Sequence, residues 1–438
     1  MIFKPWRDFS RVVFYAEKMV KLNEYAHMKL WISRLRKGIN IMKQKISQAV
    51  ILAGGKGERL KPFTDKSPKP MYPVQGVPFI DRLVDQVKSF GIDEIVLLLG
   101  YMADQVIDEL GDGSKFGVKI SYDVTPVEYD TGDRLKHAQA LLKDKFLLMY
   151  CDNYCPIDFE GLVNSNAENG SLIQLTVYSN KDGYTKNNLI VEEDGRVSVY
   201  DKKRVTPNLQ GVDIGYALVD KKTVEDLDDD MPGSFAKVYP QLVEQGKLYA
   251  TVTDHRYYSI GGFERMPLTE EFFKNKKAVF LDRDGTINVR APKACYIEKP
   301  EDFVWLDGAI EAIKMLNDAG VIIVLVSNQP GIARGNMTEE DLALIHDKMN
   351  ADLAANGAKI DHIYYCPHNW DEGCDCRKPA PGMLYQAQRD LSLNIDNCIL
   401  FGDDERDIEA ADRARCKSEL ITEEYTILDA VKKYLANM

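Results

Sequence analysis

The sequence has no apolar run long enough to cross a membrane. Its apolar runs are short, of which Val321–Val326 is an example, whereas a membrane-spanning helix needs about 18 or more such residues. Lys, Arg, Asp and Glu recur throughout the N-terminal region, so the uninterrupted apolar block of a secretory signal is also missing. The sequence therefore predicts a cytoplasmic protein without a membrane span.

The chain also has no excess of basic residues and has few cysteines. Its 56 Lys and Arg are outnumbered by 68 Asp and Glu, and the formal net charge of −12 argues against a nucleic-acid partner, which would need a basic surface. Phosphates can still bind an acidic protein locally, at loops, helix N-termini or a metal ion. Eight cysteines in 438 residues are too few for a disulfide scaffold, and three of them crowd between residues 366 and 376 beside a histidine.

The length of 438 residues predicts more than one domain. From residue 47 onward, apolar strand patterns alternate with amphipathic helix patterns, which is typical of mostly parallel sheets covered by helices. The series runs twice, and a short polar junction near Phe273–Lys277 separates the two runs. We therefore predict two three-layer α/β domains, a Rossmann-like domain over residues 47–273 and a Rossmannoid domain over residues 274–438.

Residues 1–46 precede the first α/β series and are basic and amphipathic. Apolar residues recur at helical spacing in this segment, at Phe9, Val12, Val13, Ala16, Met19 and Val20. A helix of this kind can lie on a membrane surface or dock on a partner. The alternative that we favour is a leader helix outside the folded domain, or an extension upstream of the natural start, because Met42 closely precedes the first strand pattern.

Two carboxylates separated by one residue, Asp282 and Asp284, end the apolar run that opens the second series. Reactive groups gather at the carboxyl ends of strands in open α/β sheets, and Gly285 allows the sharp turn that brings both carboxylates into one crevice. One carboxylate can attack phosphorus to form an aspartyl-phosphate, and its neighbour can protonate the leaving alcohol and later deprotonate water. A carboxylate approaches a phosphate dianion only with charge cancellation, so the motif also predicts a divalent cation.

Three further residues fit the same chemistry. Asp403, in "FGDDERD", is a candidate metal ligand at another strand end, and the Ser327 hydroxyl follows "VIIVLV", where it can hold phosphoryl oxygens. Lys378, in "CRKP", can neutralise the charge that develops during phosphoryl transfer. Each of these motifs alone is compatible with a solvated turn, but all of them together, in this order along the chain, favour a phosphotransfer site.

The segments "DRDGT", "SNQPGIARG", "CPHNWDEGCDCRKPAPGM" and "GDDERDI" resemble the haloacid-dehalogenase phosphatases, in the branch that contains heptose-bisphosphate and histidinol-phosphate phosphatases. The resemblance covers residues 276–438 approximately. It implies Asp282 as nucleophile and Asp284 as acid/base, with Mg²⁺ held by Asp282, the backbone carbonyl of Asp284, and Asp403. The residues that it implies around the phosphate and the substrate are Ser327, Asn328, Arg334, Arg377 and Lys378.

Cys366-x-His368 and Cys374-x-Cys376 are two ligand pairs separated by a five-residue loop. Three thiolates and one imidazole at such spacing close a tetrahedral site with no open position for water, which predicts a structural Zn²⁺. The alternative is chance placement of cysteines in a cytosolic protein. A zinc ion in this loop would hold the neighbouring Arg377 and Lys378 so that their cationic groups face the substrate phosphate.

A glycine-rich loop, "ILAGGKGERLKPFTDKSPKPM", follows the first strand pattern of the first series. Gly54, Gly55 and Gly57 would let backbone N–H groups approach a triphosphate closely. Arg59 and Lys69 bring positive charge to the same loop. The pattern is neither a Walker loop nor a Rossmann fingerprint.

GGxGxRL followed by PKPM resembles the sugar-phosphate nucleotidyltransferases, over residues 47–270 approximately. In that family a sugar-1-phosphate oxygen attacks the α-phosphorus of a nucleoside triphosphate, and pyrophosphate leaves. The resemblance implies that Arg59 grips the β- and γ-phosphates, that Lys69 contacts the phosphates in transfer, and that Asp152 holds a Mg²⁺. Lys202, in "VYDKK", matches a family lysine near the sugar phosphate more weakly.

The chain departs from this family at two places. The segment "DTGDRL", from Asp130 to Leu135, replaces a loop that usually reads "LGTGGAL". Ser259 stands where a second metal-binding Asp is expected, and losing one anionic ligand weakens divalent binding. The first domain is then slow, uses another carboxylate such as Asp254, or only binds nucleotide sugars.

The two resemblances meet in the synthesis of activated heptose for lipopolysaccharide or capsule. They predict a bifunctional enzyme that removes the 7-phosphate of D-glycero-D-manno-heptose 1,7-bisphosphate and couples the remaining 1-phosphate to a nucleotide. GTP is the favoured nucleotide because the α-anomer route uses guanylyl transfer. Two alternatives stay open: a phosphatase whose first domain only binds nucleotide sugars, and a histidinol-phosphate phosphatase, whose His-x5-Cys zinc spacing this chain shares.

Overall fold

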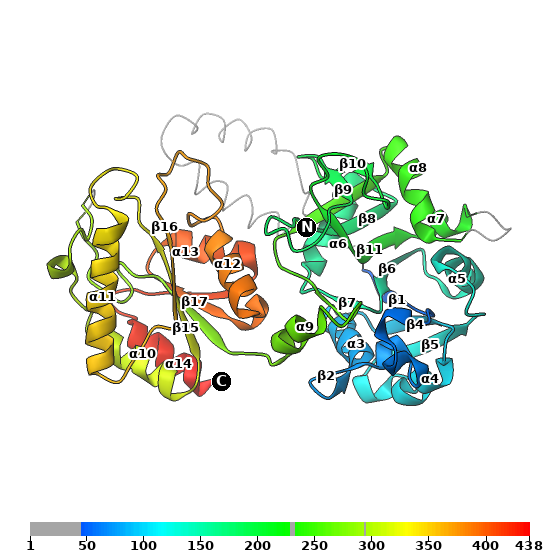
Figure 1. Cartoon of the computed structure of the whole chain (residues 1–438), viewed down its shortest axis with the longest axis horizontal. Helices are drawn as coiled ribbons and strands as arrows, with labels where there is room; N and C mark the ends of the chain where they lie inside the picture. The colour runs from blue at the N-terminus through cyan, green and yellow to red at the C-terminus, as the bar shows by residue number, and fades with distance from the viewer. Residues whose placement is uncertain (1–44, 228–232, 293–294) are drawn as a thin grey trace, which may run out of the picture. The chain divides into compact units, whose positions relative to one another are not determined.

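The computed structural model describes residues 45–227, 233–292 and 295–438. The amphipathic segment predicted for residues 1–46 lies outside them, apart from its last two residues. Among the described residues, no helix has both the length and the apolar character that a membrane crossing requires. The described chain is built around two separate large sheets (Figure 1).

The first large sheet has seven strands in the order β12-β8-β11-β6-β1-β4-β5, and we call it, with its helices, the first domain. Its strands are β1 (Gln48–Ala53), β4 (Glu94–Leu99), β5 (Lys119–Val124), β6 (Lys145–Tyr150), β8 (Ile173–Tyr178), β11 (Val212–Asp220) and β12 (Leu248–Thr253). Neighbouring strands are parallel except where β11 pairs with β6 and β8. The predicted mostly parallel sheet is therefore confirmed, whereas the reversed β11 was not predicted.

Apolar side chains project from both faces of this sheet, so both faces need a covering layer. In β1, Ala49 and Ile51 pack into one core, whereas Val50 and Leu52 pack into a second core. The helices are α3 (Phe79–Ser89), α4 (Ala103–Leu110), α5 (Thr131–His137), α6 (Phe159–Asn169), α7 (Lys222–Glu225), α8 (Val238–Glu244) and α9 (Met266–Phe273). The short strand pairs are β2 (Pro73–Val74) with β3 (Val77–Pro78), β7 (Asn153–Tyr154) with β13 (Tyr258–Ser259), and β9 (Leu189–Val191) with β10 (Val197–Tyr200).

The second large sheet has five parallel strands in the order β16-β15-β14-β17-β18, and we call it, with its helices, the second domain. Its strands are β14 (Ala278–Leu281), β15 (Ile322–Asn328), β16 (His362–Cys366), β17 (Ile399–Gly402) and β18 (Lys417–Leu420). Its helices are α10 (Ala309–Asp318), α11 (Glu339–Ala355), α12 (Gly382–Leu391), α13 (Glu405–Ala414) and α14 (Ile427–Ala436). Val279 and Leu281 enter one core while Ala278 and Phe280 enter the other, so this domain is also a three-layer α/β structure, as predicted.

The carboxyl ends of the central strands decide where the second domain can do chemistry. The central strand β14 has β15 on one side and β17 on the other, with Leu281 beside Leu325 and Phe401. Because all these strands are parallel, the residues that follow them emerge at the same edge of the sheet. Asp282, Ser327 and Asp403 are therefore brought to one edge from segments far apart in the sequence.

Candidate active sites

A cavity of about 430 Å³ opens at this edge of the second domain. That volume is within the usual range for a small-molecule site. The predicted residues that line it are Asp282, Asp284, Ser327, Asn328, Arg334, Arg377 and Lys378. Asp403 does not line the cavity, but its carboxylate lies next to that of Asp282. The predicted phosphatase residues are thus gathered in one place.

Asp282 lies at the centre of a buried cluster of charges. The Lys378 ammonium donates to the Asp282 carboxylate at 2.7 Å and pairs with Asp407 at 2.5 Å. Burial and the nearby Asp407 charge raise the pKa of Asp282 to about 7, although Lys378 opposes the shift. Burial alone would lower the pKa of Lys378, but the two carboxylates outweigh it and raise that pKa. The cluster therefore holds more negative than positive charge.

Asp282, Asp403 and Asp407 can each offer a carboxylate oxygen, and these three oxygens lie within 4.8 Å of one another. Burial raises the pKa of Asp403 to about 6. A Cβ at Gly285, whose φ is 96°, would lie 1.8 Å from the Asp403 carboxylate, so glycine is required there for the ligand to approach the loop. Hard oxygen ligands with uncompensated charge fit a divalent cation such as Mg²⁺.

The Asp284 carboxylate is held away from this cluster by hydrogen bonds. Arg283, which is fully buried, donates to both of its oxygens, Asn288 donates at 2.9 Å and Gln329 donates at 3.0 Å. Burial would raise the pKa of Asp284, but the Arg283 guanidinium and these hydrogen bonds outweigh it and hold the pKa below its usual value. The Asp284 carboxylate is thus not one of the three carboxylates that can share a metal ion, which are those of Asp282, Asp403 and Asp407. The metal contact predicted for Asp284 is that of its backbone carbonyl.

The cavity is lined by several guanidinium groups, beside the carboxylates of Asp282, Asp284, Asp404 and Asp407. Arg334 and Arg377 line it as predicted, and Arg290 and Arg406 line it in addition. The Arg290 guanidinium donates to the Asp403 carboxylate at 2.7 Å and to the Asp284 carbonyl at 3.3 Å. Four guanidinium groups around one cavity favour a substrate that carries more than one anionic group.

The four predicted zinc ligands meet at one point. Cys366 Sγ lies 3.6 Å from both His368 Nδ1 and Cys374 Sγ, and Cys376 Sγ lies 3.3 Å from His368 Nδ1 and 3.5 Å from Cys374 Sγ. A zinc tetrahedron with bonds of about 2.0–2.3 Å has edges of about 3.3–3.8 Å, so these separations fit. All eight cysteines of the chain are free of disulfides, which agrees with the sequence interpretation.

Sequence reasoning missed several residues of this site. Asp407 lies in the quoted segment "GDDERDI" and follows the predicted ligand Asp403 by one helical turn, but only the pairing with Lys378 shows its position. Arg283 was passed over as the residue between two catalytic candidates. Gln329 follows Ser327 and Asn328 in the quoted "SNQPG", and nothing in the spacing indicated that its amide reaches Asp284.

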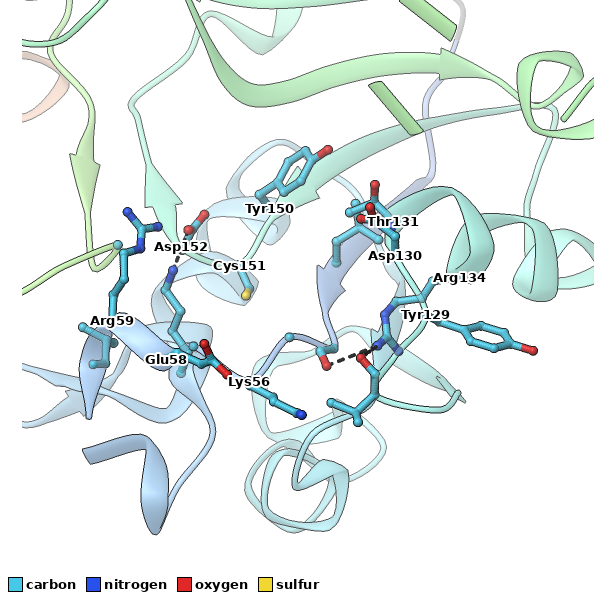
Figure 2. A pocket seen from close by; sticks show the side chains of 18 residues that line it. Lys56, Glu58, Arg59, Tyr129, Asp130, Thr131, Arg134, Tyr150, Cys151 and Asp152 are labelled. Atoms are coloured by element: carbon cyan, nitrogen blue, oxygen red, sulfur yellow. Dashed lines mark hydrogen bonds and ion pairs between the residues drawn. The ribbon is translucent and has the colours of Figure 1, made fainter. Parts of the chain in front are cut away.

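A second cavity, of about 610 Å³, lies in the first domain. The predicted residues that line it are Gly54, Gly55, Gly57, Arg59, Lys69 and Asp152. Figure 2 shows Arg59 and Asp152 on one side of this cavity and Asp130, Thr131 and Arg134 on the opposite side. A Cβ at Gly55 would meet no atom within 4 Å, so the space in front of the glycine loop is open to a ligand.

Within the described part of the chain, one cationic side chain pairs with the carboxylate predicted to bind metal in the first domain. Lys69 Nζ lies 2.6 Å from the Asp152 carboxylate. Ser259 is buried beside it and donates its hydroxyl to the Asp152 carbonyl at 3.0 Å, so it supplies no charged ligand. Asp254 pairs with Lys181 at 3.2 Å and does not line the cavity, and Lys202 donates to Ser234 instead of lining it. Among the described residues, no cluster of three metal-ligand side chains includes Asp152.

Arg134 gives the first domain a feature that the sequence did not reveal. Its buried guanidinium donates to the carbonyls of Leu99 at 2.6 Å, Pro126 at 3.1 Å and Gly54 at 3.2 Å. A Cβ at Gly54 would lie 2.2 Å from this guanidinium. Glycine is therefore required at position 54 to make room for Arg134. The sequence had predicted another reason for this glycine, the close approach of backbone N–H groups to a triphosphate.

Comparison with known proteins matches both halves of the chain. A family model for nucleotidyl transferases matches residues 48–282. A family model for polynucleotide kinase 3 phosphatases matches residues 277–422. The D-glycero-beta-D-manno-heptose-1,7-bisphosphate 7-phosphatase of Photorhabdus laumondii is 44% identical over 151 residues, which are 33% of this chain and 79% of that protein.

The chain belongs to the nucleotidyl transferase family and to that of the heptose-bisphosphate phosphatases. It is a fusion of a nucleotidyl transferase domain with a haloacid-dehalogenase-type phosphatase domain, and both halves belong to enzyme families. A second phosphatase of the same name, from Pasteurella multocida, is 40% identical over 152 residues, covering 33% of this chain and 81% of that protein.

Two solved structures are similar to parts of this chain. The D,D-heptose 1,7-bisphosphate phosphatase of B. bronchiseptica, complexed with magnesium and phosphate, is 33% identical, covers 37% of this chain and 99% of its own, and has a TM-score of 0.35. HddC from Yersinia pseudotuberculosis is 28% identical, covers 52% of this chain and 100% of its own, and has a TM-score of 0.45.

Proposed function

We propose that the fusion is a bifunctional enzyme of nucleotide-activated heptose synthesis. The second domain removes the 7-phosphate of D-glycero-D-manno-heptose 1,7-bisphosphate with Mg²⁺, and the first transfers a nucleotide, GTP being favoured, to the heptose 1-phosphate. The observation that carries the proposal is the buried Asp282 carboxylate, held by Lys378 in a cavity lined by four arginines, in a domain 44% identical over 151 residues to one heptose-bisphosphate phosphatase. The names of those relatives specify the β anomer, whereas the GTP assignment rests on the α-anomer route. We assign the activity to the cytoplasm, where nucleoside triphosphates are available.

In the phosphatase reaction, an oxygen of Asp282 attacks phosphorus and the bond between phosphorus and the sugar oxygen breaks. Because the Arg283 guanidinium and the hydrogen bonds hold the pKa of Asp284 below its usual value, Asp284 must take up a proton from solvent before the attack. It donates that proton to the leaving sugar oxygen and then takes a proton from the water that attacks the aspartyl-phosphate. This second attack releases phosphate and restores Asp282. Lys378 and the guanidinium groups of the cavity stabilise charge on the phosphoryl oxygens. A divalent ion at Asp282, Asp403 and Asp407 would neutralise the remaining negative charge so that the phosphate dianion can approach.

In the transferase reaction, a sugar-1-phosphate oxygen attacks the α-phosphorus of the triphosphate and pyrophosphate leaves. Arg59 and Lys69 lie where they can contact the phosphates, and Asp152 is the carboxylate for a metal ion. We place the boundary between the two activities at residues 273–274, since α9 ends at Phe273 and β14 begins at Ala278.

The substrate of the phosphatase is tested by direct comparison. We expect the purified full chain to release phosphate from D-glycero-D-manno-heptose 1,7-bisphosphate with a kcat/KM at least about 10²-fold above that for histidinol phosphate, because the second anionic group of the bisphosphate meets the additional guanidinium groups. Phosphate release under matched magnesium and zinc is the measurement. A higher kcat/KM on histidinol phosphate would replace the heptose assignment by the histidinol one.

A second candidate function keeps the phosphatase and makes the first domain a nucleotide-sugar-binding module. Ser259 favours this candidate, because it leaves Asp152 without a second carboxylate ligand. A domain with one carboxylate can still bind phosphates through Arg59, Lys69 and the glycine loop, but it aligns the attacking oxygen less well.

Pyrophosphate release separates these two candidates. We expect the full chain, mixed with heptose 1-phosphate, to release pyrophosphate faster with GTP than with ATP, CTP or UTP. Lys69→Met should lower that rate by about 10²-fold or more, since it removes the cation beside the transferred phosphates, and should leave phosphate release by the second domain unchanged. The absence of pyrophosphate with all four nucleotides, together with measurable nucleotide-sugar binding, would make the first domain a binding module.

A further inference from the structure

The Gln329 side chain links two functional groups of the phosphatase cavity. Its amide nitrogen donates to the Ser327 hydroxyl at 2.7 Å and to the Asp284 carboxylate at 3.0 Å, and its amide oxygen accepts from Arg283 at 3.2 Å. Gln329 is only 2% exposed. The reverse orientation of the amide would point its oxygen at a carboxylate and its nitrogen at a guanidinium, so the surroundings determine one orientation.

Among the described residues, three side chains hold the Asp284 carboxylate, and only one of them also reaches the phosphate side of the cavity. Arg283 and Asn288 come from the same loop as Asp284 and move with it. Gln329 follows β15, so its hydrogen bond determines where the Asp284 carboxylate lies relative to Ser327. No other side chain in this network contacts both of these groups among the described residues.

The backbone of the segment after β15 is itself held in place. The Gln329 N–H donates to the Cys366 carbonyl at 2.8 Å, and the Asn328 side chain donates to the Lys378 carbonyl at 3.0 Å while it accepts from the Lys378 N–H at 3.0 Å. We call the segment from Cys366 to Cys376 the cysteine loop. Cys366 begins this loop and Lys378 follows it, so the contacts hold the segment after β15 from both ends of the loop. A glutamine with a fixed backbone and one allowed amide orientation can position the carboxylate that it contacts.

We propose that Gln329 is a positioning residue that keeps the acid/base carboxylate of Asp284 in reach of the oxygen leaving the phosphoryl group at Ser327. The proposal rests on the phosphatase function proposed above. A general acid works only within hydrogen-bond reach of the oxygen that it protonates. The need for a general acid depends on the leaving group. A sugar alkoxide is a poor leaving group unless it is protonated, whereas a nitrophenolate leaves without protonation. Loss of positioning therefore affects the two substrate types differently.

Gln329→Leu tests the proposal, because leucine has a similar volume and makes neither hydrogen bond. We expect kcat/KM on the sugar bisphosphate to fall by about 10²-fold, while kcat/KM on p-nitrophenyl phosphate changes by less than about 3-fold. We compare kcat/KM because it reports the steps up to formation of the aspartyl-phosphate and not the later hydrolysis, which is the same for both substrates. Asp284→Asn should show the same dependence on the leaving group. The double variant should lose no more activity on the sugar phosphate than Asp284→Asn alone, since Gln329 acts through Asp284.

Gln329→Met is the second variant, because its unbranched side chain has nearly the length of glutamine but cannot donate to Asp284. It should show the same selective loss while its thermal unfolding stays close to that of the wild type. Equal losses on both substrates, or no loss on the sugar phosphate, would overturn the proposal. If the wild type hydrolyses other alkyl phosphates but not the heptose bisphosphate, the proposed substrate is wrong. The role of Gln329 is then tested by comparing those alkyl phosphates with p-nitrophenyl phosphate in the same variants.

Discussion

Asp282→Asn should abolish phosphate release by the second domain, with a loss of at least about 10⁴-fold, the scale on which removal of a covalent nucleophile acts. The amide nitrogen does not attack phosphorus, and the amide oxygen is a far weaker nucleophile than a carboxylate. The fold should survive, because the asparagine keeps an oxygen near Lys378 and Lys378 keeps its ion pair with Asp407 at 2.5 Å. Phosphate release from the heptose bisphosphate measures the loss.

The same variant should leave pyrophosphate release by the first domain unchanged. Asp318→Asn is a matched control, since this exposed carboxylate at the end of α10 pairs only with Lys314 across one helical turn in the described structure. It should leave both activities unchanged. Rapid-quench trapping during turnover should recover phosphate on Asp282 of the wild type. Loss of both activities in Asp282→Asn would show that the two domains are not catalytically independent.

Removal of zinc should have the second large effect, on the stability of the second domain and on KM. Metal binding to three thiolates and an imidazole contributes about 10–16 kcal/mol in small zinc peptides, so we expect Cys374→Ser to lower the free energy of unfolding of this domain by several kcal/mol. The wild type should contain one zinc per chain by elemental analysis, and the variant should contain much less.

The kinetic effect should fall on substrate binding before it falls on chemistry. Arg377 donates to the His368 carbonyl and Arg334 to the Asn369 side chain, so both cations depend on the cysteine loop. Lys378 is held independently by Asp282, Asp407 and the Val326 carbonyl. We therefore expect a zinc-depleted sample with magnesium to show a KM for the bisphosphate about 10-fold higher or more, with kcat changed less.

Restoration of the KM by added zinc, and not by added magnesium, is the control for the depletion. If the zinc-free protein kept its KM and its substrate preference, the cysteine loop would not position Arg334 and Arg377 for substrate binding. A kcat that falls as far as KM rises would mean that the loop also holds Lys378.

Much of the phosphatase site was predictable because its residues lie in short contiguous segments. Asp282 and Asp284 follow one apolar strand pattern, and Asp403 follows another. Strand order brings such segments to one edge whenever the sheet is parallel, so the motif and the fold class together predict the cluster. The cysteine loop was predictable for the same reason, since all four ligands lie within eleven residues, from Cys366 to Cys376.

The sequence by itself determined the two α/β domains and predicted Asp282 as a nucleophile, the four candidate zinc ligands and the glycine loop, because periodicity and local spacing are properties of adjacent residues. Tertiary structure decided that Asp407 joins the metal-ligand carboxylates, that Gln329 reaches Asp284, and that Gly54 makes room for Arg134. The physical reason is that side-chain hydrogen bonds depend on the packing of distant segments: the Arg134 guanidinium meets carbonyls 35 and 80 positions away in the chain.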